Sequence, residues 1–318
     1  AFRPLTETLR DAGPLIAAGL GISLGFRVGL FNIGGNGQMV FGILWATWIS
    51  TRVEMPIILH VVVAVIVAIL GAAFWGALVG FLKAQTGAHE VILTIMLNYV
   101  AIGLFTWFIR SPNLLQQEAA GGTPKSDAPA VTAQLPAFLP GTYSLHWGFL
   151  LAVGAVAVYW WLMERSAIGY RFRMVGHNPG AARTAGISVE RTYVWAMAAS
   201  AAFVGVAGAN QALGTQIGYT ETVHAGIGFD GITVALLGGG NAVGILFAGL
   251  LFGAFKAGGP QMQVTGISPE VLGIVQGAIV LFIAAPPLVR AIFRLPVLAS
   301  TPMLDRVRAM TKRKEGTS

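Results

Sequence analysis

Three side-chain amides, on Asn32, Asn36 and Gln38, interrupt an apolar stretch near the start of the chain. They lie in FNIGGNGQM, residues 31–39, together with three glycines that disfavour a continuous helix. If this region lies within a membrane, its open backbone must be buried in protein or line a wet cavity, as at the solute sites of transporters. An ordinary turn at the membrane surface is the alternative interpretation.

A second interruption has the sequence LLGGGNA, residues 236–242. The apolar segments on either side, 227–238 and 242–258, are each shorter than the roughly 20 residues that a membrane-spanning helix needs. This pattern predicts a hairpin of short or discontinuous helices across residues 227–258.

The stretch 169–187 combines basic side chains with a short capped helix. Asn178 is a helix-capping residue, and Pro179 suits the first helical position. The helix continues through alanines and ends at a glycine: Ala181, Ala182, Ala185 and Gly186. A helix of about two turns on a loop offers a small surface that fits a groove in a partner. A basic loop that only sets the membrane orientation would explain the arginines but not the helix.

Several kinds of chemistry are excluded by the residues that are present. The sequence GIGFDG at residues 226–231 matches a dinucleotide-binding pattern, but it opens an apolar segment and follows no strand. There is no GxxxxGK[ST] motif, so ATP hydrolysis would require another chain. The chain has no cysteine, and its five histidines are scattered without the spacing of metal ligands. We therefore expect neither a metal site nor a cofactor in this chain.

The composition points to a membrane protein. Of 318 residues, 55% are hydrophobic and only 10% are charged, against roughly 25% charged in an ordinary soluble domain. None of the apolar segments alternates as a barrel strand does. We predict an all-α polytopic membrane protein with about nine membrane segments. Those segments are 13–30, 36–50, 57–82, 91–109, 147–163, 192–213, 227–238, 242–258 and 270–285.

Glycines four residues apart occur in three of these segments: Gly21/Gly25/Gly29, Gly76/Gly80 and Gly249/Gly253. Small residues at this spacing let helix backbones approach closely. We expect them to pack helices within the chain, with a subunit interface as the alternative.

Arginine and lysine gather in segments 164–191 and 286–318, whereas 110–146 carries only Arg110 and Lys125. The positive-inside rule therefore makes the first two segments cytoplasmic and the third an external loop. Five prolines and Gly121-Gly122 indicate that the external loop is rich in turns.

This orientation leads to a domain organisation. We expect one membrane domain over residues 1–285 and a basic cytoplasmic tail over 286–318. Counting spans back from a cytoplasmic segment at 83–90 places residue 1 outside. We therefore also expect a further span upstream of this sequence, which would give ten.

Four segments, in chain order, resemble one family. FNIGGNGQM resembles the NIGaEGQ signature of permease subunits of ABC importers for nucleosides and simple sugars, and EVILTIMLN at 90–98 resembles its EVI-x-TIMLN segment. Residues 169–187 and 228–238 resemble its cytoplasmic loop and its GfdgIaVALLG segment. Two departures are Asn36, where an acidic residue is common, and Met174, where alanine is common.

The resemblance implies the ten-span permease fold of the ribose and branched-chain amino-acid importers, in the cytoplasmic membrane. It also implies three partners: a second related permease, an ATPase with two nucleotide-binding halves, and an extracytoplasmic solute-binding lipoprotein. No nucleic-acid partner is implied. The pairing of the first two segments is more similar to the nucleoside-type permeases, so a nucleoside is the expected solute.

We assign roles to residues on this basis. Asn32, Gln38 and Asn98 are expected to line the solute path, because uncharged donors and acceptors suit ribose hydroxyls and base edges. The expected contacts with the ATPase are Arg171, Arg173, Gly176, Asn178, Ala181, Ala182, Ala185 and Gly186.

A secondary transporter driven by an ion gradient is the alternative function. Such a transporter needs ionisable side chains within the membrane. Asp230 and Glu221 are acidic residues close to the second-half spans, and both lie near span ends.

Overall fold

The computed structural model describes residues 2–111, 113–117, 124–138, 145–214, 218–220, 225–266, 268 and 270–284. The chain divides into two units, Ala1–Val280 and Leu281–Ser318. The basic tail predicted at 286–318 lies outside the described residues, as do Glu221 and the Gly121-Gly122 pair of the predicted external loop. The fold presented below is that of the first unit.

The described part of the chain is helical, with no strand beyond two isolated bridges in the segments around Gln116 and Ala137. The helices are α1 (Arg3–Arg27), α2 (Gly35–Arg52), α3 (Ile57–Thr86), α4 (Glu90–Arg110), η1 (Val131–Ala133), α5 (Gly148–Trp160), η2 (Trp161–Arg165), α6 (Ala167–His177), α7 (Pro179–Thr184), α8 (Val189–Leu213), α9 (Ile227–Leu237), α10 (Ala242–Val264) and α11 (Glu270–Ala284). The all-α prediction is confirmed for these residues.

Each of the nine predicted apolar segments overlaps helical residues, although α1 begins ten residues before the predicted start at 13 and the segment 147–163 is divided between α5 and η2. Five described helical segments are long and apolar enough to cross a membrane: Ile57–Thr86, Glu90–Arg110, Gly148–Arg165, Val189–Leu213 and Ala242–Val264. Helix α9 is a shorter apolar helix, as the sequence predicted, and α11 has a shorter apolar stretch, Glu270–Ile279. The total of nine membrane segments stays a prediction.

The prediction for the segment after the second interruption was wrong in its length. We expected a short helix over 242–258, but α10 runs unbroken to Val264 and contains Pro260. A proline removes one backbone hydrogen bond, and helices within membranes tolerate this loss when neighbouring groups compensate. The discontinuity of 227–258 is therefore confined to the short α9 and the turn after it.

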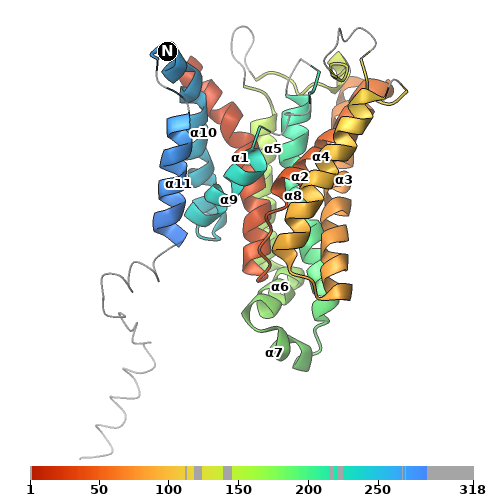
Figure 1. Ribbon diagram of the computed structural model, residues 1–318, viewed down its shortest axis with the longest axis vertical. Helices are drawn as coiled ribbons and strands as arrows, with labels where there is room; N and C mark the ends of the chain where they lie inside the picture. Colours follow the sequence, from red (N-terminus) through yellow and green to blue (C-terminus); the bar gives the residue numbers. More distant parts are fainter. Residues whose placement is uncertain are drawn as a thin grey trace, which may run out of the picture. The chain divides into compact units, whose positions relative to one another are not determined.

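Helices α1 and α8 form the centre of the bundle (Figure 1). Helix α8 packs against α3, α1 and α2, while α1 also packs against α10, α9 and α5. A Cβ added to Gly76 would lie 2.4 Å from the Cβ of Ala201, and one on Gly253 would lie 2.6 Å from the Cβ of Ala12. These glycines therefore pack helices within the chain, as predicted.

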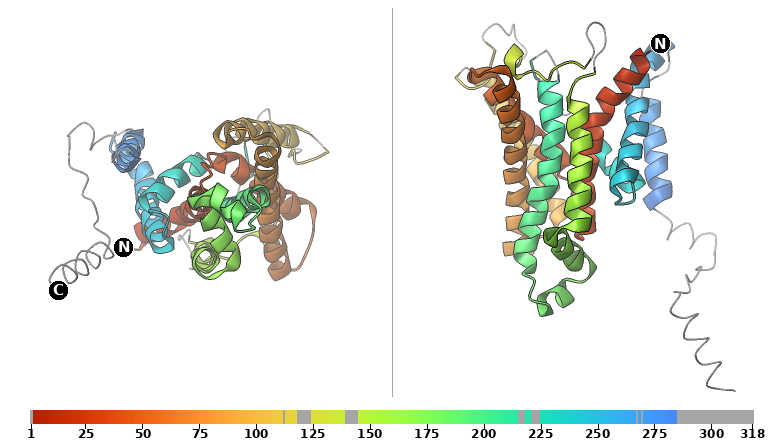
Figure 2. Two further views of the ribbon diagram at one scale, coloured as in Figure 1. Left: turned by 90° about the horizontal axis from the view of Figure 1, so that it is seen from below. Right: turned by 180° about the vertical axis from the view of Figure 1, so that it is seen from behind.

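The two loop regions lie at opposite ends of the bundle. Helices α6 and α7 sit beside the start of α8 (Figures 1 and 2). At the other end, the backbone N–H of Ala130 donates to Ser50 near the end of α2, and that of Leu135 donates to Leu213 at the end of α8. Segments 164–191 and 124–138 thus lie at different ends, which agrees with the predicted sidedness.

Candidate functional site

The first interruption forms a buried joint between α1 and α2. Helix α1 ends at Arg27 and α2 begins at Gly35, so a short non-helical connection lies between them. The side chain of Asn32 is fully buried here. Its Nδ2 donates to Gln38 Oε1 at 3.1 Å and to Ser200 Oγ at 2.9 Å. Its Oδ1 accepts from Gln38 Nε2 at 3.1 Å and from the backbone of Gly34 at 2.9 Å.

Asn98 holds the same joint from the side of α4. Its Oδ1 accepts from the backbone N–H of Gly37 at 2.8 Å, and its Nδ2 donates to Ile33 O at 3.0 Å. The first N–H groups of a helix have no partner within the helix, so this side chain satisfies one that would otherwise be buried unpaired. The link also fastens α4 to the start of α2.

The predicted path residues therefore have a well-defined position. The exposed fractions of Asn32, Gln38 and Asn98 are 0%, 0% and 5%, and all three make hydrogen bonds within the chain. In this conformation they hold the joint, and none of them lines the cavities described below. The remaining amide, Asn36, is 3% exposed and its Oδ1 has no hydrogen-bond partner among the described residues.

The start of α9 crosses the start of α2 at this joint. A Cβ on Gly228 would lie 2.3 Å from the backbone nitrogen of Asn36, and a Cβ on Gly35 would lie 2.7 Å from Gly228 O. Only glycine on both helices allows this approach. In the GIGFDG segment, Gly226 precedes the first turn of α9 with φ of +72°, and Gly231 packs on Ala18 of α1. The glycines thus serve helix packing, without the strand of a dinucleotide site.

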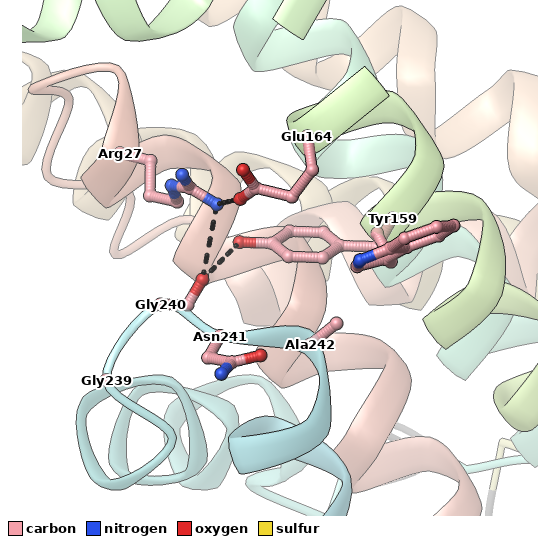
Figure 3. A pocket seen from close by; sticks show the side chains of 8 residues that line it. Arg27, Tyr159, Glu164, Gly239, Gly240, Asn241 and Ala242 are labelled. Atoms are coloured by element: carbon pink, nitrogen blue, oxygen red, sulfur yellow. Dashed lines mark hydrogen bonds and ion pairs between the residues drawn. The ribbon is translucent and has the colours of Figure 1, made fainter. Parts of the chain in front are cut away.

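The second interruption, between α9 and α10, is held by side chains from α1, α5 and η2 (Figure 3). Arg27 Nη1 lies 2.5 Å from Glu164 Oε1 and donates to Gly240 O at 3.5 Å. The hydroxyl of Tyr159 donates to the same carbonyl at 3.3 Å. Gly239 and Gly240 have φ of +60° and +75°, which side chains disfavour.

A cavity of about 440 Å³ adjoins these contacts. Asn241 and Ala242, at the start of α10, contribute to its lining (Figure 3). The hairpin predicted from LLGGGNA is confirmed, and its turn is fastened to the end of α1.

An ion pair lies between α9 and α10. Asp230 Oδ2 and Lys256 Nζ are 2.7 Å apart, and Nζ also lies 3.4 Å from Ala225 O. Lys256 is about 21 Å along α10 from its first residue, at 1.5 Å per residue, and so lies within the membrane depth of roughly 30 Å.

The ion pair borders a cavity of about 450 Å³ that is also lined by Gln263, Glu270 and Gln276. Our sequence interpretation considered Asp230 and missed Lys256. A lysine within an apolar segment of 23 residues was the available signal.

The predicted coupling segment contains one more helix than expected. We predicted a loop with one short helix, but α6 precedes it, capped by Ser166, whose Oγ accepts from Gly169 at 2.9 Å. The predicted cap of α7 is confirmed, because Asn178 Oδ1 accepts from the backbone of Ala181 at 3.0 Å. Gly186 follows with φ of +80°, as its predicted role requires.

Three residues of the predicted ATPase contact are instead buried or partly buried against other residues of this chain. Ala182 is fully buried, so our expectation that it presents a surface to a partner was wrong. A Cβ on Gly176 would lie 2.2 Å from Arg27 O, so this glycine packs α6 under the end of α1. Arg173 is partly buried, with Nη1 3.9 Å from Glu164. The exposed members of the predicted set are Arg171, Asn178, Ala181, Ala185 and Gly186.

The described residues contain no group of three or more acidic, histidine or cysteine side chains that could hold a metal ion. What the chain does contain is a bundle with two glycine-rich helix interruptions, an ion pair at membrane depth and a helical segment at one end. These features define a polytopic membrane protein built for transport.

Comparison with known proteins gives the family. Residues 5–284 match the family model for the permease component of the branched-chain amino acid transport system. The guanosine ABC transporter permease protein NupP of Bacillus subtilis is 36% identical over 286 residues, which cover 89% of this chain and 82% of NupP. The chain belongs to this family of ABC-transporter permeases and is a multi-pass protein of the cytoplasmic membrane.

Two further relatives show the range of the similarity. The nucleoside ABC transporter permease protein NupB of Lactococcus lactis is 34% identical, over 89% of this chain and 79% of NupB. The glucose ABC transporter permease protein TsgB13 of Haloferax volcanii is 33% identical, over 88% of this chain and 75% of TsgB13. No solved structure matches the chain.

Proposed function

We propose that this chain is the permease subunit of an importer that carries nucleosides into the cell. The observation that supports it most is the similarity, over 89% of the chain, to relatives named for guanosine and for nucleosides. The chemistry of the interior agrees with a polar solute without net charge. Its polar groups at the joint are amides and hydroxyls, and the carboxylate of Asp230 is neutralised by Lys256.

We infer that Asn32, Gln38 and Asn98 support the solute path indirectly, by fixing the position of the helices that border it. Their hydrogen bonds hold the start of α2 against α4 and α8, while Gly35 packs on Gly228 of α9. The path itself would lie where this permease meets a second, related one. Two guanosine ABC transporter permease proteins of Bacillus subtilis, NupP and NupQ, match this chain at 36% and 24% identity, which supports a pair of permeases.

We propose that α6 and α7 contact a separate ATPase and couple its conformational changes to this chain. The exposed surface of α7, with Ala181 and Ala185, is available to a cytoplasmic partner. An extracytoplasmic lipoprotein that delivers the solute completes the proposed system. An ion-gradient mechanism through Asp230 has less support, because the ion pair with Lys256 occupies the carboxylate that would bind the ion.

Uptake of labelled solutes tests the proposed solute. Cells that lack their own nucleoside uptake would express this chain with its partner subunits, and uptake of guanosine, uridine and glucose would be compared. A variant of the ATPase that lacks the Walker A lysine is the control. We expect nucleoside uptake that disappears in the control. Uptake of glucose alone would refute the nucleoside assignment, and uptake that survives in the control would refute the ATP-driven mechanism.

The coupling segment is tested by adding charge to it. Ala185→Glu places a carboxylate at the exposed residue that directly follows α7, where partner contact would desolvate it. Gln85→Glu adds the same charge to an exposed site at the end of α3 and is the matched control. We expect Ala185→Glu to lower co-purification of the ATPase at least tenfold, which corresponds to about 1.4 kcal/mol. Equal yields for both variants would show that α7 makes no contact with the ATPase.

A further inference from the structure

A groove of about 1000 Å³ lies beside α6 and α7, at the end of the bundle that we predict to be cytoplasmic. One wall comes from Leu162 of η2 and from α6, and the other from the start of α8. It is separate from both helix interruptions and from the ion pair, because none of their residues lines it.

The groove extends from the cytoplasmic surface into the membrane. Its lining on α8 reaches to Ala199, which is about 10 Å beyond Thr192, the first residue of the predicted span, at 1.5 Å per residue. One leaflet of a hydrocarbon core of roughly 30 Å is about 15 Å deep. The groove therefore extends through about two thirds of one leaflet.

Its deep part is apolar and open. Leu162 and Trp195, which both belong to predicted spans, line it, and Trp195 is 68% exposed; Ile168, nearer the mouth, is 52% exposed. A soluble protein cannot fill a surface at membrane depth, whereas lipid acyl chains can. Tyr170 and Trp195 also have the amphipathic rings that favour the membrane interface.

Its mouth is basic. Arg171 and Arg191 both line the groove and are exposed. Neither forms an ion pair with any described residue, since the nearby acidic side chains have other partners: Glu164 pairs with Arg27 and Arg173, and Glu190 pairs with Arg183. Basic pockets at the cytoplasmic side of membrane helices suit anionic lipid headgroups.

We propose that this groove binds an anionic phospholipid of the cytoplasmic leaflet. The phosphate lies between Arg171 and Arg191, and an acyl chain runs along Trp195 toward Ala199. The site is complete within this one chain and does not depend on which solute is transported.

Native mass spectrometry of the purified chain tests the headgroup contact. The chain is mixed with equal amounts of phosphatidylglycerol and phosphatidylcholine, and the bound lipid is counted. We expect phosphatidylglycerol to be preferred. Arg171→Gln with Arg191→Gln should lower its affinity on the order of 30-fold, since each arginine near an anionic surface contributes about 1 kcal/mol.

A second pair of arginines provides the matched control. Arg165 and Arg183 are exposed at the same end of the bundle and do not line the groove. Arg165→Gln with Arg183→Gln removes the same charge and should keep the preference. An equal loss in both double variants, or equal binding of both lipids by the unmodified chain, would overturn the proposal.

Two further measurements locate the acyl chain. Phosphatidylglycerol with brominated chains should quench tryptophan fluorescence less in Trp195→Phe than in the unmodified chain, and equal fractional quenching would refute the acyl-chain placement. Glycerol phosphate should not displace the lipid; full displacement would reduce the groove to a simple anion site. If the Arg171→Gln and Arg191→Gln variant kept phosphatidylglycerol and lost the ATPase, the groove would belong to that partner instead.

Discussion

The carboxylate of Asp230, in the first turn of α9, lies 2.7 Å from the ammonium group of Lys256 on α10. Their side chains are 22% and 32% exposed, so the pair is partly shielded from solvent. An unpaired charge in such a place is costlier than the pair itself. The pair therefore fastens α9 to α10.

Neutralising one member of this pair should destabilise the protein more than neutralising both. We expect Lys256→Met to lower the free energy of unfolding by about 1 to 3 kcal/mol, below the value for a fully buried pair because of the partial exposure. Asp230→Asn combined with Lys256→Met should recover most of this loss. Thermal unfolding in detergent measures both variants. Additive effects of the two changes would show that the ion pair is not coupled.

The amide joint should be sensitive to loss of Asn32. Asn32→Leu leaves the side chains of Gln38 and Ser200 and the N–H of Gly34 with fewer partners in a buried site. Each buried polar group left unsatisfied costs about 1 to 3 kcal/mol, so we expect a total loss of about 3 kcal/mol or more. Unfolding in denaturant is the measurement. Asn178→Ala, which removes only the exposed cap of α7, should cost about 1 kcal/mol and serves as the comparison.

The predicted sidedness can be tested on a chain that contains no cysteine. Val131 in η1 is 81% exposed, and Thr184 at the end of α7 is exposed as well. We expect Val131→Cys to react with a membrane-impermeant maleimide in intact cells, and Thr184→Cys to react only after the membrane is opened. Labelling of Thr184→Cys in intact cells, with Val131→Cys protected, would invert the orientation.

His146 should make stability depend on pH at the end of the bundle that carries η1. Burial, and then the positive charge of Arg10, lowers the pKa of His146 from 6.5 to about 4. The unfolded chain therefore binds a proton on this side chain at a higher pH than the folded chain does. Stability is lost as the pH falls from about 6.5 to about 4, by up to about 3 kcal/mol.

The matched variant for this prediction is His146→Asn. Nδ1 of His146 accepts from the backbone N–H of Gly148 at 3.1 Å, and an asparagine carbonyl can accept the same bond without titrating. The melting temperature of this variant should fall less between pH 7 and pH 5 than that of the unmodified chain. Identical pH profiles would exclude His146 as the source of acid sensitivity.

The apolar segments, the helix cap and the helix-ending glycine could be predicted from sequence because they depend on local chemistry. For most of the nine predicted segments, apolar length predicted both helix ends to within a few residues. The exceptions are the start of α1, which lies ten residues earlier than predicted, and the end of α10, which lies six residues later. The cap at Asn178 and the left-handed Gly186 followed from the preferences of single residue types.

Features that depend on packing could not be predicted in this way. Ala182 and Ala185 lie on one short helical segment, yet Ala182 is buried and Ala185 is exposed, because α7 packs against α6 and α8. The direction in which Asn32 and Gln38 point depends on Ser200, which is 168 residues away from Asn32 in sequence. Helix α6 was missed because its apolar positions, such as Phe172 and Val175, lie among arginines that we assigned to a loop.

The glycine crossing of α2 and α9 makes the joint a fulcrum. Where Gly35 meets Gly228, backbone lies on backbone, so no side chains interlock at the crossing itself. Beyond the crossing, α9 carries Asp230 and then leads to the Gly240 turn that Arg27 holds. A displacement of this turn from the α6 side would therefore pivot α9 about its first turn and move Asp230 in the same direction.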